Sequence, residues 1–165
     1  MTQAAATPKP VDVVLVATDF SELGDIALSQ ALQFAAERGL SSLHVVHVAA
    51  GLGPLLKVDL PDNVHTVSAE QALDLLRRLA DEVRAQHVPE FEADKVHYYV
   101  RVGTPSTEVI RLADELSADL IVVGTHGRTG VRRLLLGSVA EAVVRHAKCP
   151  VLVARVKDYS SEERA

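Results

Sequence analysis

A glycine-rich segment in the second half of the chain has the spacing of an anion-binding loop. An apolar run ending at Val123 leads into Gly124 and Gly127, and nine residues further on come Gly137 and Ser138. Glycine permits positive φ angles and close backbone approach, so consecutive N–H groups in such a loop can surround a phosphate. A helix beginning near Ser138 would add its first N–H groups and its dipole. The spacing therefore indicates a candidate phosphate site.

Ordinary structural roles compete with this interpretation. The glycines can serve turn geometry alone, and Ser138-x-x-Glu141 fits a capping box in which the serine hydroxyl accepts a hydrogen bond from the helix backbone. Ser138 could also cap the empty site and turn to the phosphate in the filled one. Two known motifs are excluded, because the chain has no Walker P-loop and the turn after the first apolar run, Thr18 to Ser21, lacks the dinucleotide glycines.

A carboxylate follows the first predicted strand. Asp19 comes directly after the run Val11–Ala17, where it could bond ribose hydroxyls, hold a cation that bridges phosphates, or simply cap the first helix. In open parallel sheets, ligands bind beyond the carboxyl ends of the strands, where the winding direction reverses. With strand order 3-2-1-4-5, Asp19 and Gly124 face each other across that crevice.

Five short β-branched runs alternate with helical segments and must position these residues. The predicted strands are Val11–Ala17, Leu43–Val48, Val96–Val102, Leu120–Val123 and Val151–Val156. Several are continuous apolar stretches, as in strands buried on both faces. The pattern predicts an α/β fold with an open five-stranded, mainly parallel sheet of order 3-2-1-4-5 and helices on both faces.

The helical segments have an apolar period of about 3.6 residues. The clearest runs from Ala69 to Val83; the others are Ala27–Ala35 ending near Gly39, a helix with Thr104 as N-cap and Pro105 as first residue, and Val139–Ala147. The segment Ala49–His65 contains glycines and prolines without a clear period, so it is predicted to be a long loop, which in a compact domain is often functional.

Composition excludes several classes of protein. The 165 residues, 48% of them hydrophobic, predict one domain at residues 11–156, with a flexible tail at 1–10 and a polar tail at 157–165. The net charge of −5 argues against sequence-independent nucleic-acid binding. No apolar run approaches the roughly 20 residues that span a membrane. The N-terminus lacks a secretory core and the single Cys149 cannot form an internal disulfide, so a cytoplasmic location is expected.

The remaining polar residues favour structural roles. His44 and His47 are three residues apart on one predicted strand and so point to opposite faces, and no cluster of His, Cys and Asp has zinc spacing. His126, inside the glycine loop, is expected to be placed by the backbone rather than to be catalytic, and Cys149 is expected in the core. Three arginines after the glycines are either solvated or reach a terminal phosphate: Arg128, Arg132 and Arg133.

The chain resembles the universal stress protein (UspA-type) family across about residues 9–156. The segments that carry the resemblance are Val14–Ser21, Leu43–Val48, Gly103–Pro105, Ala118–Gly127, Leu136–Ala140 and Cys149–Val153. Members with the pattern Gly-x2-Gly-x9-Gly-Ser/Thr resemble the ATP-binding branch, and that pattern is complete here. The resemblance implies a Rossmann-like fold of the adenine nucleotide alpha hydrolase-like type, and ATP with Mg²⁺ as ligand.

The resemblance also implies positions for the nucleotide. The residues expected beside the adenosine are Ala17, Thr18, Asp19 and, through its backbone, Val48; those beside the ribose and phosphates are Val123, Gly124, His126 and Gly127; those holding the phosphates are Gly137, Ser138, Val139 and Ala140. Some members have a hydroxyl residue where Ala140 stands, so one phosphate hydrogen bond is expected to be missing.

Three functions are weighed for such a protein. The first is a cytosolic, nucleotide-dependent sensor or regulator in the stress response, with at most slow ATP hydrolysis and an unknown protein partner. The second is an ATP-hydrolysing or phosphoryl-transferring enzyme with Asp19 or His126 as base. The third is a nucleotide-independent interaction dimer. The resemblance implies a homodimer through the last strand, Val151–Val156, whose apolar edge invites pairing unless the chain's own tail covers it.

Overall fold

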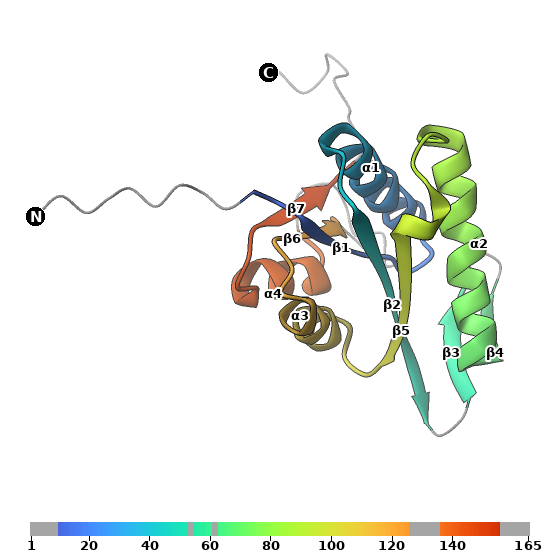
Figure 1. The fold of residues 1–165 in the computed structure, drawn as a ribbon. Helices are drawn as coiled ribbons and strands as arrows, with labels where there is room; N and C mark the ends of the chain where they lie inside the picture. Colours follow the sequence, from blue (N-terminus) through green and yellow to red (C-terminus); the bar gives the residue numbers. More distant parts are fainter. Residues whose placement is uncertain (1–9, 53–54, 61–62, 126–135, 156–165) are drawn as a thin grey trace, which may run out of the picture.

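Five parallel strands form the centre of the molecule (Figure 1). The computed structural model describes residues 10–52, 55–60, 63–125 and 136–155. The strands are β1 (Val13–Ala17), β2 (Ser42–Leu52), β5 (Val96–Val102), β6 (Leu120–Gly124) and β7 (Val151–Ala154). They lie in the order β5-β2-β1-β6-β7. Numbered among themselves they are 3-2-1-4-5, so the predicted order is confirmed.

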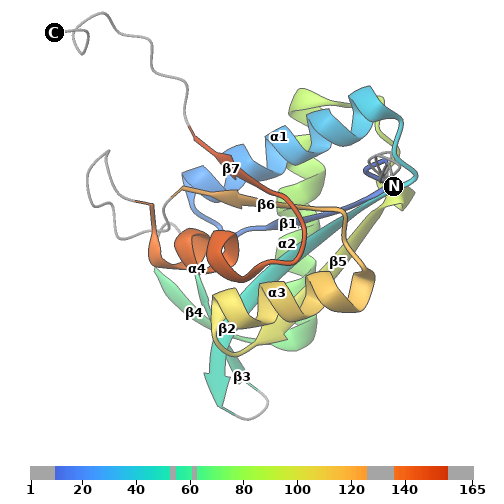
Figure 2. The ribbon, with the colours of Figure 1, turned by 90° about the vertical axis from the view of Figure 1, so that its left-hand side faces the viewer.

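Two pairs of helices cover the two faces of this sheet (Figure 2). One face carries α1 (Glu22–Arg38) and α2 (Ala69–His87), whose buried side chains share one apolar cluster with the strands. The other face carries α3 (Pro105–Leu116) and α4 (Ser138–His146), which pack into a second cluster. Both faces are therefore buried, which explains why the strands are almost continuously apolar.

Local sequence signals fix where the helices begin and end. Gly39 ends α1 in the left-handed conformation, with φ of 63°. The hydroxyl of Ser68 accepts from the Gln71 N–H, and the Gln71 side chain accepts in return from the Ser68 N–H, so α2 begins with a complete capping box. Thr104 and Pro105 begin α3 as predicted, although the Thr104 side chain makes no capping hydrogen bond.

The prediction of a long loop at Ala49–His65 is wrong. In the structure β2 continues to Leu52, and two further strands, β3 (Leu55–Asp59) and β4 (Val64–Ser68), extend the sheet in antiparallel fashion. Leu56 and Val58 are buried in the cluster beneath α2. Their alternation with exposed neighbours is the period of a half-buried strand, which the surrounding glycines and prolines obscured. Within the described residues, the sheet therefore has seven strands and is mixed.

Some predicted boundaries also change. The first strand begins at Val13 rather than Val11, and β7 ends at Ala154. Val156 lies outside the described residues, as do the predicted tails apart from Pro10. An additional short 3₁₀ helix, Ala93–Lys95, precedes β5.

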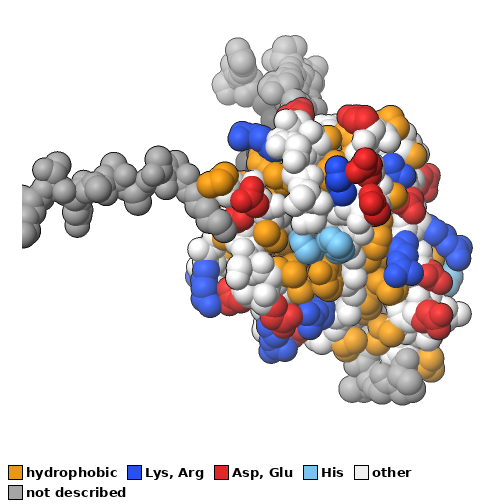
Figure 3. Space-filling model, viewed as in Figure 1, with side chains coloured by type: hydrophobic (Ala, Val, Ile, Leu, Met, Phe, Trp, Pro, Cys, Tyr) orange, Lys and Arg blue, Asp and Glu red, His pale blue; other side chains and the backbone are white. Residues whose placement is uncertain are grey.

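The described surface is mixed in charge. On the face shown in Figure 3, basic and acidic side chains alternate, and the part of the chain that is coloured there gathers no broad basic area. Among the described residues, no helix is both long enough and apolar enough to cross a membrane.

Candidate functional site

The strand order brings the predicted acid and the predicted glycine loop to one edge of the sheet. β1 pairs with β6, with Val16 opposite Val122, and on its other side with β2, with Ala17 opposite Val46. Thr18, which follows β1, and Gly124, the last residue of β6, therefore lie at the same level of neighbouring parallel strands. This is the point where the winding direction reverses, since the chain moves outward to β2 and β5 on one side and to β6 and β7 on the other.

Asp19 lies in a tightly bonded turn between β1 and α1. Its Oδ1 accepts a hydrogen bond from the Ser21 N–H at 3.1 Å and another from the Ser21 hydroxyl. Ser21, not Asp19, caps α1, because its hydroxyl accepts from the Gly24 N–H at 3.2 Å. Phe20 has φ of 61°, in the left-handed region, and its N–H donates to Thr18 Oγ1 at 3.2 Å. Asp19 thus has a turn-forming role, while its Oδ2 makes no hydrogen bond to the described residues.

Two glycines let the first turn of α1 lie directly against this edge. A Cβ at Gly24 would be 2.6 Å from Thr18 Oγ1 and 2.9 Å from Asp19 Oδ1. A Cβ at Gly124 would be 2.8 Å from the carbonyl oxygen of Leu23. Real Cβ atoms do not approach other atoms this closely, so both positions require glycine for packing. Gly124 therefore has a structural role whether or not a phosphate binds beside it.

Hydrogen bonds close the base of the glycine loop. The Thr125 N–H donates to the Ala154 carbonyl at 3.0 Å, and the Gly137 N–H donates to the Thr125 carbonyl at 2.7 Å. These two amides are satisfied within the protein, so they are not available to a phosphate. The residues between them that were predicted for the site, His126, Gly127 and Arg128, lie outside the described residues.

The capping-box interpretation of Ser138 is wrong, because Gly137 is the N-cap of α4 and Ser138 is its first helical residue. The first bond within the helix runs from the Glu141 N–H to the Gly137 carbonyl at 2.8 Å. The amides that precede Glu141 in the helix are those of Ser138, Val139 and Ala140. They have no acceptor among the carbonyls of the helix itself. The side chains of Ser138 and Val139 are exposed, so the start of α4 places an exposed hydroxyl beside amides that the helix itself does not use.

The other predicted site residues are mostly packed in the sheet. Val123 is buried opposite Val153, Ala17 is half-buried at the end of β1, and Val48 is half-buried within β2, four residues before its end at Leu52. The methyl group of Ala140 is buried in the apolar cluster between α4 and the sheet. What Ala140 can offer a ligand is therefore its backbone N–H.

Negative charge surrounds the β1–α1 turn. The pKa of the Asp25 carboxyl is raised above its ordinary value, chiefly because burial penalises the charged form and further because Asp19, Glu82 and Glu22 are negatively charged. An anionic ligand beside Asp19 would meet this field, so it would favour binding together with a cation.

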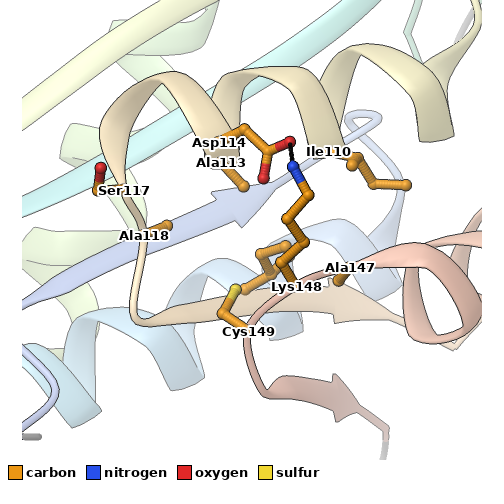
Figure 4. A pocket seen from close by; sticks show the side chains of 9 residues that line it. Ile110, Ala113, Asp114, Ser117, Ala118, Ala147, Lys148 and Cys149 are labelled. Atoms are coloured by element: carbon orange, nitrogen blue, oxygen red, sulfur yellow. Dashed lines mark hydrogen bonds and ion pairs between the residues drawn. The ribbon is translucent and has the colours of Figure 1, made fainter.

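Two cavities lie away from this edge. One, of about 330 Å³, lies between α3 and the segment that joins α4 to β7 and is shown in Figure 4, where the Lys148 ammonium reaches across to the Asp114 carboxylate at 2.7 Å and Cys149 lines the wall. The other, of about 390 Å³, lies between α1 and α2. Neither contains a residue predicted for the site, so these two cavities are separate from the candidate site at the strand ends.

Comparison with known proteins agrees with this arrangement. The sequence model of the universal stress protein family matches residues 10–155. The chain belongs to the universal stress protein family. Universal stress protein MJ0531 of Methanocaldococcus jannaschii is 33% identical over 146 residues, covering 86% of this chain and 81% of the relative.

Solved universal stress proteins have the same fold. The crystal structure of one in complex with cAMP has a TM-score of 0.66 at 26% identity and covers 89% of this chain and 99% of that one. The universal stress protein UspA from Lactobacillus plantarum has a TM-score of 0.62 at 26% identity, covering 90% and 100%. Because the family model matches residues 10–155, the family assignment covers all of the described strands and helices.

One residue beside the site of this universal stress protein is not predicted by its sequence to belong there. His47 is buried, with 4% of its surface exposed, and its Nδ1 is 3.0 Å from the carbonyl oxygen of Thr18. The sequence correctly predicts that His47 and His44 face opposite sides of β2. It contains no signal for the contact with the β1–α1 turn, because that contact joins residues 29 positions apart.

Proposed function

We propose that this universal stress protein belongs to the ATP-binding branch of the family and works in the cytoplasm as a nucleotide-dependent sensor or regulator of the stress response. ATP with Mg²⁺ would lie across the carboxyl ends of β1, β2 and β6. The adenosine would lie beside Ala17 to Asp19 and Val48, and the phosphates would lie over the glycine loop and the start of α4. Occupancy would change the surface available to a protein partner.

The observation that carries the proposal is the placement of Asp19 and the start of α4 at one edge of the sheet. The Asp19 Oδ2 is an acceptor and suits a ribose hydroxyl or a cation, whereas the first amides of α4 are donors and suit phosphate oxygens. The complete Gly-x2-Gly-x9-Gly-Ser pattern and the resemblance to a universal stress protein solved with cAMP support an adenine nucleotide.

Slow hydrolysis fits this site better than rapid turnover. A general base needs an accessible atom within hydrogen-bond reach of the attacking water. Asp19 Oδ1 is already engaged by Ser21, and its Oδ2 is the atom that this proposal assigns to the ribose or the cation, so neither oxygen is left to activate a water. A steady-state assay decides between the two functions, since turnover of about 1–10³ s⁻¹ would indicate an enzyme and values several decades lower a regulator.

The binding test uses a charge placed at the first residue of α4. Ser138→Glu adds a carboxylate where the phosphates are proposed, yet an acidic residue suits a helix N-terminus, so the fold should be retained. Thr107→Glu in the first turn of α3 is the matched control. By equilibrium dialysis with labelled ATP and Mg²⁺, we expect wild type and Thr107→Glu to bind with a Kd below about 1 mM and Ser138→Glu to bind at least about tenfold more weakly. Absence of binding by wild type, or equal binding by Ser138→Glu, would contradict the proposal.

We further propose a homodimer through the edge of β7. The Pro150 and Ala154 carbonyls accept from the β6 side, so by alternation the backbone groups of Val151 and Val153 point toward the outer edge. Val153→Pro removes an outward N–H while leaving the bonds to β6 intact. We expect light scattering to show a dimer for wild type and a weaker dimer for this variant, whereas a monomeric wild type would refute pairing.

A further inference from the structure

His47 lies inside the molecule directly behind the turn that holds Asp19. It comes from β2, the strand beside β1, and its ring is on the face covered by α1. A carbonyl oxygen can only accept a hydrogen bond, so the contact from His47 Nδ1 to the Thr18 carbonyl requires the proton to be on Nδ1. The position of that carbonyl is therefore determined by a side chain of the neighbouring strand.

The same imidazole holds the next part of the turn. The ring of Phe20 is 4.5 Å from the ring of His47, centroid to centroid, at an interplanar angle of 55°. Phe20 is buried and has φ of 61°, a conformation that a large side chain adopts only when its surroundings enforce it. The packed imidazole and the bond from the Phe20 N–H to Thr18 Oγ1 supply that enforcement.

Asp19 thus lies between two residues that are both fixed by His47. Thr18 is held through its carbonyl oxygen, and Phe20 is held through its ring. The Thr18 N–H donates to the Val46 carbonyl at 3.0 Å. Residues of β2 therefore bind both the N–H and the carbonyl group of Thr18. Without the imidazole, the turn would keep its bonds to Ser21 but lose the contacts that set its orientation relative to the sheet.

We infer that His47 is a positioning residue of the nucleotide site: it orients the Asp19 carboxylate through Thr18 and Phe20 and does not itself touch the ligand. This inference rests on the proposed nucleotide binding. It distinguishes His47 from a residue that only fills the core, because an apolar ring of equal size would satisfy packing but leave the Thr18 carbonyl without its donor.

The test compares two substitutions that separate the donor from the ring. His47→Asn retains a donor at nearly the same place, since its amide nitrogen is bonded to Cγ as Nδ1 is. His47→Phe retains a ring against Phe20 but has no donor. Leu43→Ala, a buried change on the same face of β2 four residues earlier, is the control for loss of stability alone. Affinity for ATP and the free energy of unfolding are measured for each variant.

We expect His47→Phe to bind ATP about tenfold more weakly than wild type, and His47→Asn to stay within about threefold even if it is the less stable of the two. Leu43→Ala should lose stability without losing affinity. Equal affinity of His47→Phe and wild type would overturn the inference while leaving the proposed function intact. A wild type that binds no nucleotide would instead refute the proposed function.

A measurement on the wild type covers the case in which a variant fails to fold. Long-range ¹H–¹⁵N spectra report which ring nitrogen of His47 carries the proton. We expect the proton on Nδ1 before and after addition of ATP, and a shift of that signal on binding because the charged nucleotide would lie beside the turn that the ring contacts. A proton on Nε2 alone, or no change on saturation with ATP, would overturn the inference.

Discussion

Replacing Gly124 by alanine tests whether this glycine is needed for packing. The added methyl group would lie 2.8 Å from the Leu23 carbonyl oxygen, 3.1 Å from its carbonyl carbon and 3.4 Å from its Cβ. The nearest atoms belong to the backbone of the first turn of α1, which a rotamer change cannot move. Nor can that turn shift easily, because Gly24 already approaches Thr18 and Asp19.

The size of the effect follows from two opposing terms. In an ordinary strand, glycine to alanine gains about 0.5–1 kcal/mol, because alanine loses less conformational entropy on folding. Overpacking of a close contact costs about 1–3 kcal/mol. The cost of overpacking therefore exceeds the entropic gain, and we expect the free energy of unfolding of Gly124→Ala to fall by about 1–2 kcal/mol.

Urea denaturation measures this difference directly. With an m-value of about 2 kcal/mol/M, the midpoint should fall by roughly 0.5–1 M while the slope stays unchanged. The loss should persist in a Leu23→Ala background, because the clash is with the Leu23 backbone and Cβ, which alanine retains. A midpoint equal to or above that of wild type, or full rescue by Leu23→Ala, would refute the reasoning.

Three further perturbations have expected outcomes. Gly24→Ala should lower the melting temperature, although alanine favours helices, because its Cβ would lie 2.6 Å from Thr18 Oγ1; a higher melting temperature would contradict this. Asp25 keeps its proton to higher pH in the folded than in the unfolded chain, so its ionisation costs stability as the pH rises above the ordinary pKa of 3.8. Asp25→Asn should therefore be more stable than wild type at neutral pH and lose that advantage in acid, and a pH-independent difference in urea midpoints would disprove it. Burial raises the pKa of the Cys149 thiol above 9.0, so iodoacetamide should alkylate it more slowly than free cysteine at neutral pH, and an equal rate would exclude that effect.

Much of the fold follows from local patterns. The apolar runs and the 3.6-residue periods predict the five parallel strands and four helices. A strand buried on both faces needs apolar residues along its length, and a helix that covers a sheet needs them along one face. The same patterns fail at Ala49–His65, where Leu56 and Val58 form too short an alternation to stand out between glycines and prolines. The hairpin forms because β2 pairs with β3 and α2 packs against the buried side chains of β3, and no local pattern represents either contact.

The candidate site divides in the same way. The sequence alone determines the membership in its family and the order in which an acid, a glycine loop and a helix start occur, because these depend on residue types and spacing. Only the tertiary structure decides that Ser138 follows the N-cap, that Gly124 packs directly against the first turn of α1, and that His47 contacts the Thr18 carbonyl. Each of these depends on the distance between atoms of different strands and helices, and such distances are set by how the apolar faces pack together.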